Sequence, residues 1–137
     1  MEKEFVPYTE ALALKELGFD EPCLGYYAAD ILCTGQPQEI QLDEDRNYKK
    51  SKTESFLIIV APTYSQAFRW FRDKHEIEAT TSCFYSKRLD IPYKERQYHC
   101  HIIKDGVTSK GPKYKTYEEA ELVCLKKLIS IVKEKQL

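Results

Sequence analysis

The sequence predicts an α+β fold, in which a small sheet of about four to five mostly antiparallel strands is accompanied by three helices, the C-terminal one longest and packed on the sheet. Two observations indicate this class. Short apolar or alternating segments typical of strands are interspersed with three segments of helical periodicity, and capping-box sequences precede two of those three. The length of 137 residues fits a single domain over residues 1–137.

The first half of the chain contains one helix and three strand candidates. Residues 8–17 have an apolar stripe at helical spacing, with Gly18 just beyond it, which predicts a helix that ends there. The aromatic-rich residues 23–28 predict a strand, and residues 31–33 a second one that extends it or pairs with it. Residues 56–60, FLIIV, are apolar throughout, which indicates a central strand buried on both faces.

A polar stretch separates these strands. Residues 34–54 contain almost no apolar side chains and place an acidic cluster before a basic one, so we expect a flexible surface loop. Because a loop of this length is uncommon inside a compact domain, two interpretations stay open: a functional flap or a tolerated insertion.

Two capped helices are expected in the second half. Capping boxes that begin at Thr63 and Thr116 predict a helix over 64–74 and the longest helix of the chain over 117–133. Both boxes belong to the pattern T-Y-x-[QE]-A, which recurs at a spacing of 53 residues. An ancient duplication and chance are both open as explanations.

Strand candidates occupy residues 79–85 and 97–103, between the two capped helices. The pair Asp105-Gly106 then supplies the positive dihedral angles that a tight hairpin turn needs. A short returning strand is therefore expected from Val107 onward.

The cysteine content and the absence of long apolar runs predict a soluble cytoplasmic protein. The five cysteines are odd in number, widely spaced and set mostly among apolar neighbours, which is typical of reduced core thiols. No apolar run approaches the length of a membrane span, and the first residues lack the pattern of a signal peptide.

Charge is distributed unevenly along the chain. Residues 1–85 hold 9 Lys and Arg against 15 Asp and Glu, whereas residues 86–137 hold 12 against 7. Lysines beside tyrosines around the predicted hairpin suit phosphate contacts and base stacking, which indicates a candidate nucleic-acid surface. A plain hairpin packed on a helix is the alternative. The candidate residues are Lys104, Lys110, Lys113, Lys115, Tyr98 and Tyr114.

His99 and His101 are candidate metal ligands. They alternate along one predicted strand, so both imidazoles should point to the same face. A zinc site needs a third and usually a fourth ligand, and only folding could bring His75 or Cys83 close enough. Two partly exposed sheet histidines without a metal are the alternative interpretation.

No catalytic residues and no cofactor are predicted. Cys83 or Cys100 beside one of the two strand histidines is the only conceivable pair of nucleophile and base. Because Cys100 alternates with His99 and His101, its side chain should lie on the opposite face. The scattered glycines form neither a phosphate-binding loop nor a dinucleotide fingerprint.

Two resemblances add expectations. The strings ALALKELGFDEPC, APTYSQAFRWFRDKH and YKTYEEAELVCLKKLI resemble a family of small uncharacterised proteins of Bacteroides-type gut bacteria and their phages. This resemblance implies a phage or mobile-element accessory protein in the cytoplasm of a bacterial host cell, and it supplies no active site. Residues 98–128 also look like the three-stranded sheet plus helix of the arm-type DNA-binding domains of phage integrases.

A non-enzymatic protein-interaction module is the leading functional expectation, because no catalytic set is found and aromatic side chains are in surplus. Nucleic-acid binding through the basic hairpin and C-terminal helix is the first alternative, and metal-dependent hydrolysis through His99 and His101 is the second. A protein partner is therefore expected, with nucleic acid as the other option and no membrane; a homodimer is one open oligomeric state. The aromatic residues in question are Tyr26, Tyr27, Tyr64, Trp70, Tyr85 and Tyr93.

Overall fold

The computed structural model describes residues 2–34, 40–42, 48–50, 58–84 and 96–136. The chain forms two compact units, Met1–Ala67 and Phe68–Leu137, with the boundary inside the second α-helix. The fold is α+β, as the sequence predicts. The number of strands differs from the prediction, because the described residues contain eight strands in two sheets instead of about four to five in one.

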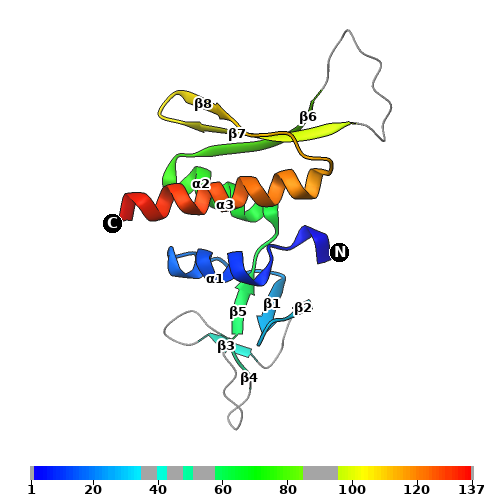
Figure 1. Ribbon diagram of the computed structural model, residues 1–137. Helices are drawn as coiled ribbons and strands as arrows, with labels where there is room; N and C mark the ends of the chain where they lie inside the picture. Colours follow the sequence, from blue (N-terminus) through cyan, green and yellow to red (C-terminus); the bar gives the residue numbers. More distant parts are fainter. Residues whose placement is uncertain (1, 35–39, 43–47, 51–57, 85–95, 137) are drawn as a thin grey trace. The chain divides into compact units, whose positions relative to one another are not determined.

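The first unit is built on a five-stranded antiparallel sheet (Figure 1). Its middle strand is β5, which confirms the central position predicted for the FLIIV segment; Phe56 and Leu57 of that segment lie outside the described residues. Ile59 and Ala61 of β5 are 1% and 0% exposed, so this strand is part of the core. The strands lie in the order β2-β1-β5-β4-β3, with bounds β1 (Gly25–Ala28), β2 (Ile31–Thr34), β3 (Ile40–Leu42), β4 (Tyr48–Lys50) and β5 (Ile58–Ala61).

Strands β3 and β4 lie inside the stretch that the sequence predicts as a polar loop. They pair antiparallel, with Ile40 opposite Lys50 and Leu42 opposite Tyr48. Ile40 and Leu42 alternate around a polar residue, the two-residue period of a strand, but the polar composition on both sides hides so short a signal. Residues 35–39, 43–47 and 51–57 lie outside the described residues.

A short 3-10 helix, η1 (Glu2–Glu4), precedes α1 (Tyr8–Glu16), which packs against β5. The end of α1 agrees with the sequence within one residue. Gly18 adopts a φ of 102°, and the Phe19 N–H donates to the Leu14 carbonyl at 2.9 Å. A glycine is favoured here because a residue with a Cβ rarely adopts this left-handed conformation.

The second helix, α2 (Tyr64–His75), begins at the predicted cap. The side-chain oxygen of Thr63 accepts a hydrogen bond from the Gln66 N–H at 3.2 Å. The expected return bond from the Gln66 side chain is replaced, because its Nε2 donates to the carbonyl of Pro22 at 2.9 Å. A β-bridge between Thr63 and Phe5 meanwhile holds the backbone at the cap.

The second unit contains a three-stranded antiparallel sheet in the order β6-β7-β8, and α3 lies along one of its faces, in contact with β6 and β7 (Figure 1). The C-terminal helix is thus the longest one and packs on a sheet, as predicted. Its side chains toward the core are Ala120, Cys124, Leu125, Leu128, Ile129 and Val132. The bounds of these elements are β6 (Glu78–Phe84), β7 (Gln97–Lys104), β8 (Val107–Lys110) and α3 (Tyr117–Gln136).

Local signals fix the turn and the helix start in this unit. Asp105 and Gly106 have φ values of 53° and 75°, the left-handed pair that a two-residue hairpin turn requires. The Glu119 N–H donates to the Thr116 side-chain oxygen at 3.1 Å, which confirms the second predicted cap. No helix among the described residues combines the length and the apolar character needed to cross a bilayer.

Candidate functional site

The β6–β7–β8 sheet has two chemically different faces. Cys100 and Ile102 of β7 are 2% and 3% exposed, and Cys100 meets Cys124 of α3, so these even-numbered positions belong to the face under the helix. His99 and His101 alternate with them and lie on the other side. We call the side turned away from α3 the outer face. The strand positions on it are Glu78, Thr80, Ser82, Phe84, Gln97, His99, His101, Ile103, Thr108 and Lys110.

The two histidines lie on the same face of β7, as the sequence predicts, and they form a close pair there. His101 is half-buried, but His99 is only 4% exposed, so the expectation of two partly exposed histidines is wrong for His99. Their Nε2 atoms are 2.6 Å apart and their ring centroids 4.5 Å apart. The Ser82 hydroxyl on the neighbouring strand lies 3.4 Å from the Nε2 of His99. Since the pair register places Ser82 opposite His99 and Thr80 opposite His101, β6 supplies hydroxyl groups along the pair.

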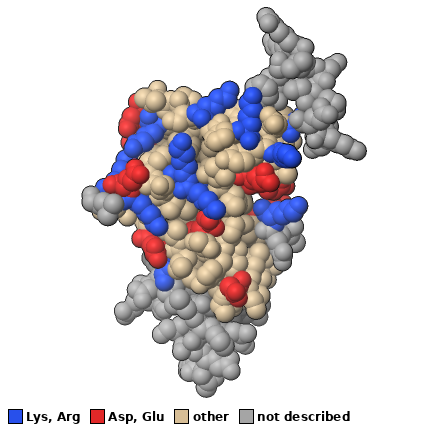
Figure 2. Space-filling model, in the orientation of Figure 1, with Lys and Arg blue, Asp and Glu red and all other residues tan. Residues whose placement is uncertain are grey.

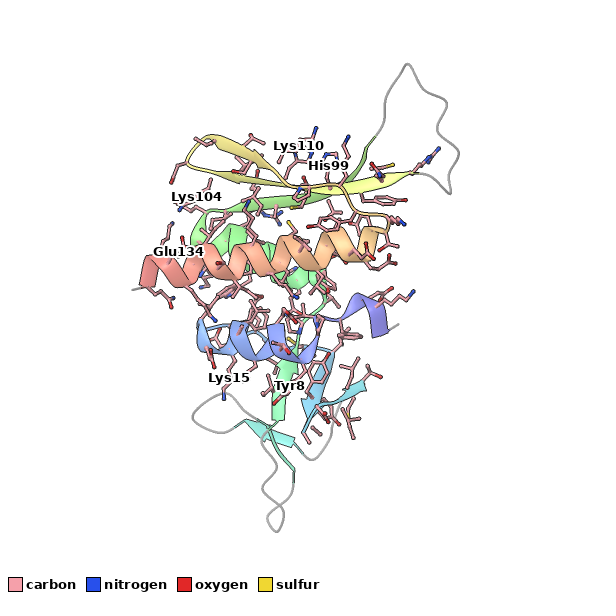
Figure 3. The ribbon with its side chains drawn as sticks, in the orientation of Figure 1. Tyr8, Lys15, His99, Lys104, Lys110 and Glu134 are labelled. Carbon is pink, nitrogen blue, oxygen red and sulfur yellow. The ribbon has the colours of Figure 1, made fainter. Side chains whose placement is uncertain are left out.

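Two lysines join this pair from the third strand and the segment that follows it. Lys110 lies directly opposite His101 in the β7–β8 ladder, and Lys113 follows three residues later. In Figure 3, His99 and Lys110 appear on the same side of the sheet, away from α3. Burial lowers the pKa of His99, and the positive charges of His101, Lys110 and Lys113 lower it further.

The other predicted nucleic-acid residues are not part of this cluster. Tyr98 packs edge-on against Tyr117 of α3, with ring centroids 5.9 Å apart. Tyr114 pairs with Tyr98 through two backbone hydrogen bonds of 2.7 and 2.6 Å. Because the side chains of directly paired residues lie on the same face of a sheet, Tyr114 is on the helix side too. Lys104 ends β7 at an even-numbered position, and Lys115 is exposed just before α3.

The structure does not bring the predicted third metal ligands to the histidine pair. His75 packs edge-on against Trp70 within α2, with ring centroids 4.8 Å apart. Cys83 pairs with Tyr98, at a position of the face opposite His99. Within the described residues, no group of three or more His, Cys, Asp or Glu side chains has the arrangement of a metal site.

The cysteine of β7 is placed as the sequence predicts. Cys100 lies in the core beside Cys124, and both thiols are buried. Burial and the neighbouring Cys100 raise the pKa of the Cys124 thiol, which keeps that thiol protonated. Because Cys100 lies on the face of β7 opposite His99 and His101, neither histidine can act as a base toward it.

Sequence reasoning missed Ser82. Its contribution depends on the register between β6 and β7, which sets it opposite His99. The run of hydroxyl residues in ATTSCFY is visible in the sequence, but nothing there indicates which of them meets a histidine.

Lysine and arginine side chains gather over the part of the molecule that carries β7, β8 and α3 (Figure 2). The unit Phe68–Leu137 holds 15 Lys and Arg against 10 Asp and Glu. The outer-face cluster therefore lies in a unit with a net positive charge, which favours anionic ligands.

No protein-family model, curated protein or solved structure matches this chain. The two resemblances described from sequence strings stay predictions, and the site is interpreted from its own geometry.

Proposed function

We propose that the second unit binds double-stranded nucleic acid through the outer face of the β6–β7–β8 sheet. The observation that carries this proposal is that His99, His101 and Lys110 share the face turned away from α3, with Lys113 close enough to act on His99 electrostatically. Cationic and hydrogen-bonding side chains in one row provide the phosphate contacts that dominate nucleic-acid affinity.

The composition of the outer face favours a duplex over a single strand. Its described side chains are hydroxyl, amide, histidine, lysine and aliphatic groups and the carboxylate of Glu78, whereas Tyr98 and Tyr114 belong to the helix side. Single strands are held mainly by bases stacked on exposed aromatic rings. A narrow antiparallel ribbon instead fits the major groove of a duplex, with its lysines reaching phosphates.

The structure weakens the observation behind the protein-interaction hypothesis. Three of the aromatic residues that suggested an exposed patch, Tyr27, Tyr64 and Trp70, are only 7%, 7% and 4% exposed. Tyr85 and Tyr93 lie outside the described residues. The aromatic surplus is used at least partly inside the molecule.

Fluorescence anisotropy with a labelled mixed-sequence DNA duplex of about 20 base pairs at about 50 mM salt tests the proposal. We expect the Lys110→Glu/Lys113→Glu variant to bind about tenfold more weakly or worse, because it replaces two phosphate contacts by repulsion. The slope of log affinity against log salt should fall by about two units. An unlabelled single strand of the same length should compete poorly.

The matched control is Lys133→Glu/Lys135→Glu, which makes the same change of charge in the last turn of α3. It should change the affinity by less than about threefold. Equal losses in both variants would mean that net charge alone attracts the duplex, and the absence of wild-type binding at low salt would reject the proposal.

A further inference from the structure

We infer that the His99–His101 pair, with Ser82, Lys110 and Lys113 around it, is a binding site for one phosphate group. The inference rests on the proposed function: it specifies where on the outer face one phosphate of the bound nucleic acid is held. The other lysines of the unit would then contribute only general attraction.

The geometry of the pair suits two oxygens of one anion. The two Nε2 atoms lie 2.6 Å apart, on the same face of one strand. In the free protein one imidazole N–H donates to the other Nε2. If both rings carry a proton, the two N–H groups can no longer bond to each other, so the rings must turn apart. Each N–H can then donate to one of two adjacent oxygens of the same anion.

The surrounding groups are donors as well. The Ser82 hydroxyl is 3.4 Å from the Nε2 of His99, and the strand ladder places Lys110 opposite His101. Lys113 also acts on His99 electrostatically. A hydroxyl therefore contacts His99, and two ammonium groups lie close enough to act on it electrostatically, so an oxyanion at the pair would meet further donors and positive charge.

The same surroundings disfavour a metal cation. The pair offers two imidazole ligands, and the described residues contain no third His, Cys, Asp or Glu beside them. The ammonium groups of Lys110 and Lys113 would repel a divalent ion, since like charges in partly buried surroundings are costly. A bound anion would instead relieve the mutual repulsion among these cationic groups.

Anion binding and proton uptake must then be coupled. The groups that face His99 are His101 on its own strand, Ser82 on β6, Lys110 on β8 and Lys113 after it. An anion favours the protonated imidazoles, so its affinity should rise as the pH falls, and its presence should raise the pKa of His99.

Imidazole NMR signals of the full-length chain test the inference without any substitution. Inorganic sulfate keeps its charge between about pH 5 and 8, so it is the oxyanion probe, with inorganic phosphate beside it and chloride at equal ionic strength as the reference. We expect sulfate and phosphate to shift the signals of His99 and His101 and to raise the pKa of His99, with about fivefold tighter sulfate binding at pH 5.5 than at pH 7.5.

His75 is an internal control in the same sample, because it lies in α2 against Trp70. Equal shifts of all three histidines, or no shift beyond that in chloride, would overturn the inference. Stoichiometric binding of zinc chloride to the pair, stronger than that of either oxyanion, would overturn it too.

Duplex binding by the His101→Gln variant separates this inference from the proposed function. A variant that binds DNA like the wild type, together with unshifted histidine signals, leaves the lysine face intact and rejects the phosphate site. Oxyanion-specific shifts without duplex binding support the site and assign it to a small phosphate ligand, which rejects the proposed function. If the His101→Gln variant loses the oxyanion response and binds the duplex with a weaker, pH-independent affinity, the result supports both the phosphate site and the proposed function.

Discussion

At the scale of single residues, Gly111 shows how closely the core under the sheet is packed. A Cβ built on it would lie 2.9 Å from the Sγ of Cys100, and its N–H donates to the Cys100 carbonyl at 2.8 Å. Cys100 is itself 2% exposed beside Cys124, so it has little room to move. Glycine is needed here for space between two strands, not for an unusual backbone conformation.

We expect Gly111→Ala to lower the free energy of unfolding by about 1–3 kcal/mol, because the added methyl group overpacks this contact. Urea denaturation followed by circular dichroism measures the change. In a Cys100→Ala background the Sγ is gone, and the same substitution should cost less than half as much. An equal cost in both backgrounds would show that the strain lies elsewhere.

The histidine pair was predictable from the sequence, but the environment that gives it a role was not. Strict alternation along one strand puts His99 and His101 on one side and Cys100 on the other, wherever that strand pairs. The identity of their neighbours depends on two registers, which place Ser82 and Lys110 opposite them. The position of Tyr98 also depends on which face α3 covers, and local sequence does not decide that.

At the scale of elements, the first turns of α3 combine acidic groups with partial burial. Burial, together with repulsion from Glu118, raises the pKa of Glu121 to about 7, although a hydrogen bond from the Tyr117 hydroxyl opposes this shift. The folded state therefore binds the proton of Glu121 more tightly than the unfolded state does. The stability that Glu121 contributes is fully present below its ordinary pKa of 4.5 and is lost as the pH rises through about 7.

Glu121→Gln should consequently stabilise the protein at pH 8 by on the order of 1 kcal/mol, since the side chain is only partly buried and solvent screens part of the effect. At pH 5 the gain should largely disappear. Urea midpoints at the two pH values provide the measurement. Glu134→Gln, an exposed change near the other end of α3, should show no such pH dependence; a similar gain at both pH values for Glu121→Gln would contradict the burial argument.

Helices were easier to predict than sheets for a physical reason. Thr63, Thr116 and Gly18 mark helix ends through hydrogen bonds or dihedral angles within a few residues, and all three act as expected. Sheet membership depends on partners distant in the chain, so the sequence predicts β5 and β7 as strands but does not show that they belong to different sheets. The recurring T-Y-x-[QE]-A pattern follows a middle strand in one case and an edge strand in the other, which gives no support for a duplicated sheet.

At the scale of the whole molecule, charge follows the division into units. The unit Met1–Ala67 holds 6 Lys and Arg against 12 Asp and Glu, whereas Phe68–Leu137 holds 15 against 10. Long-range attraction of a polyanion is therefore a property of the second unit, and the first unit should oppose it. The charge asymmetry was visible in the sequence. The boundary between the two units was not, because nothing in the composition of α2 indicates that one unit ends and the other begins inside this helix.

The same division predicts how the chain unfolds. Gly25 in β1 is packed under Phe5, since a Cβ there would lie 2.7 Å from a ring carbon and 3.3 Å from the Ala61 carbonyl oxygen. Gly25→Ala should therefore destabilise the first unit by about 1–3 kcal/mol. In native-state hydrogen exchange, amides of β1 and β5 should lose protection, whereas those of β7 and α3 should keep it, because separate cores open as separate units.

Gly111→Ala is the matched variant in the other unit, and it should produce the reverse pattern: faster exchange in β7 and α3, with β1 and β5 unchanged. Each variant then serves as the control for the other, since both add one methyl group at a crowded glycine. If either substitution lowers the protection of all four elements by the same free energy, the chain unfolds as one cooperative domain, which is what the sequence alone predicts. Opposite patterns would instead show that a substitution in the first unit can leave the histidine pair and its sheet undisturbed.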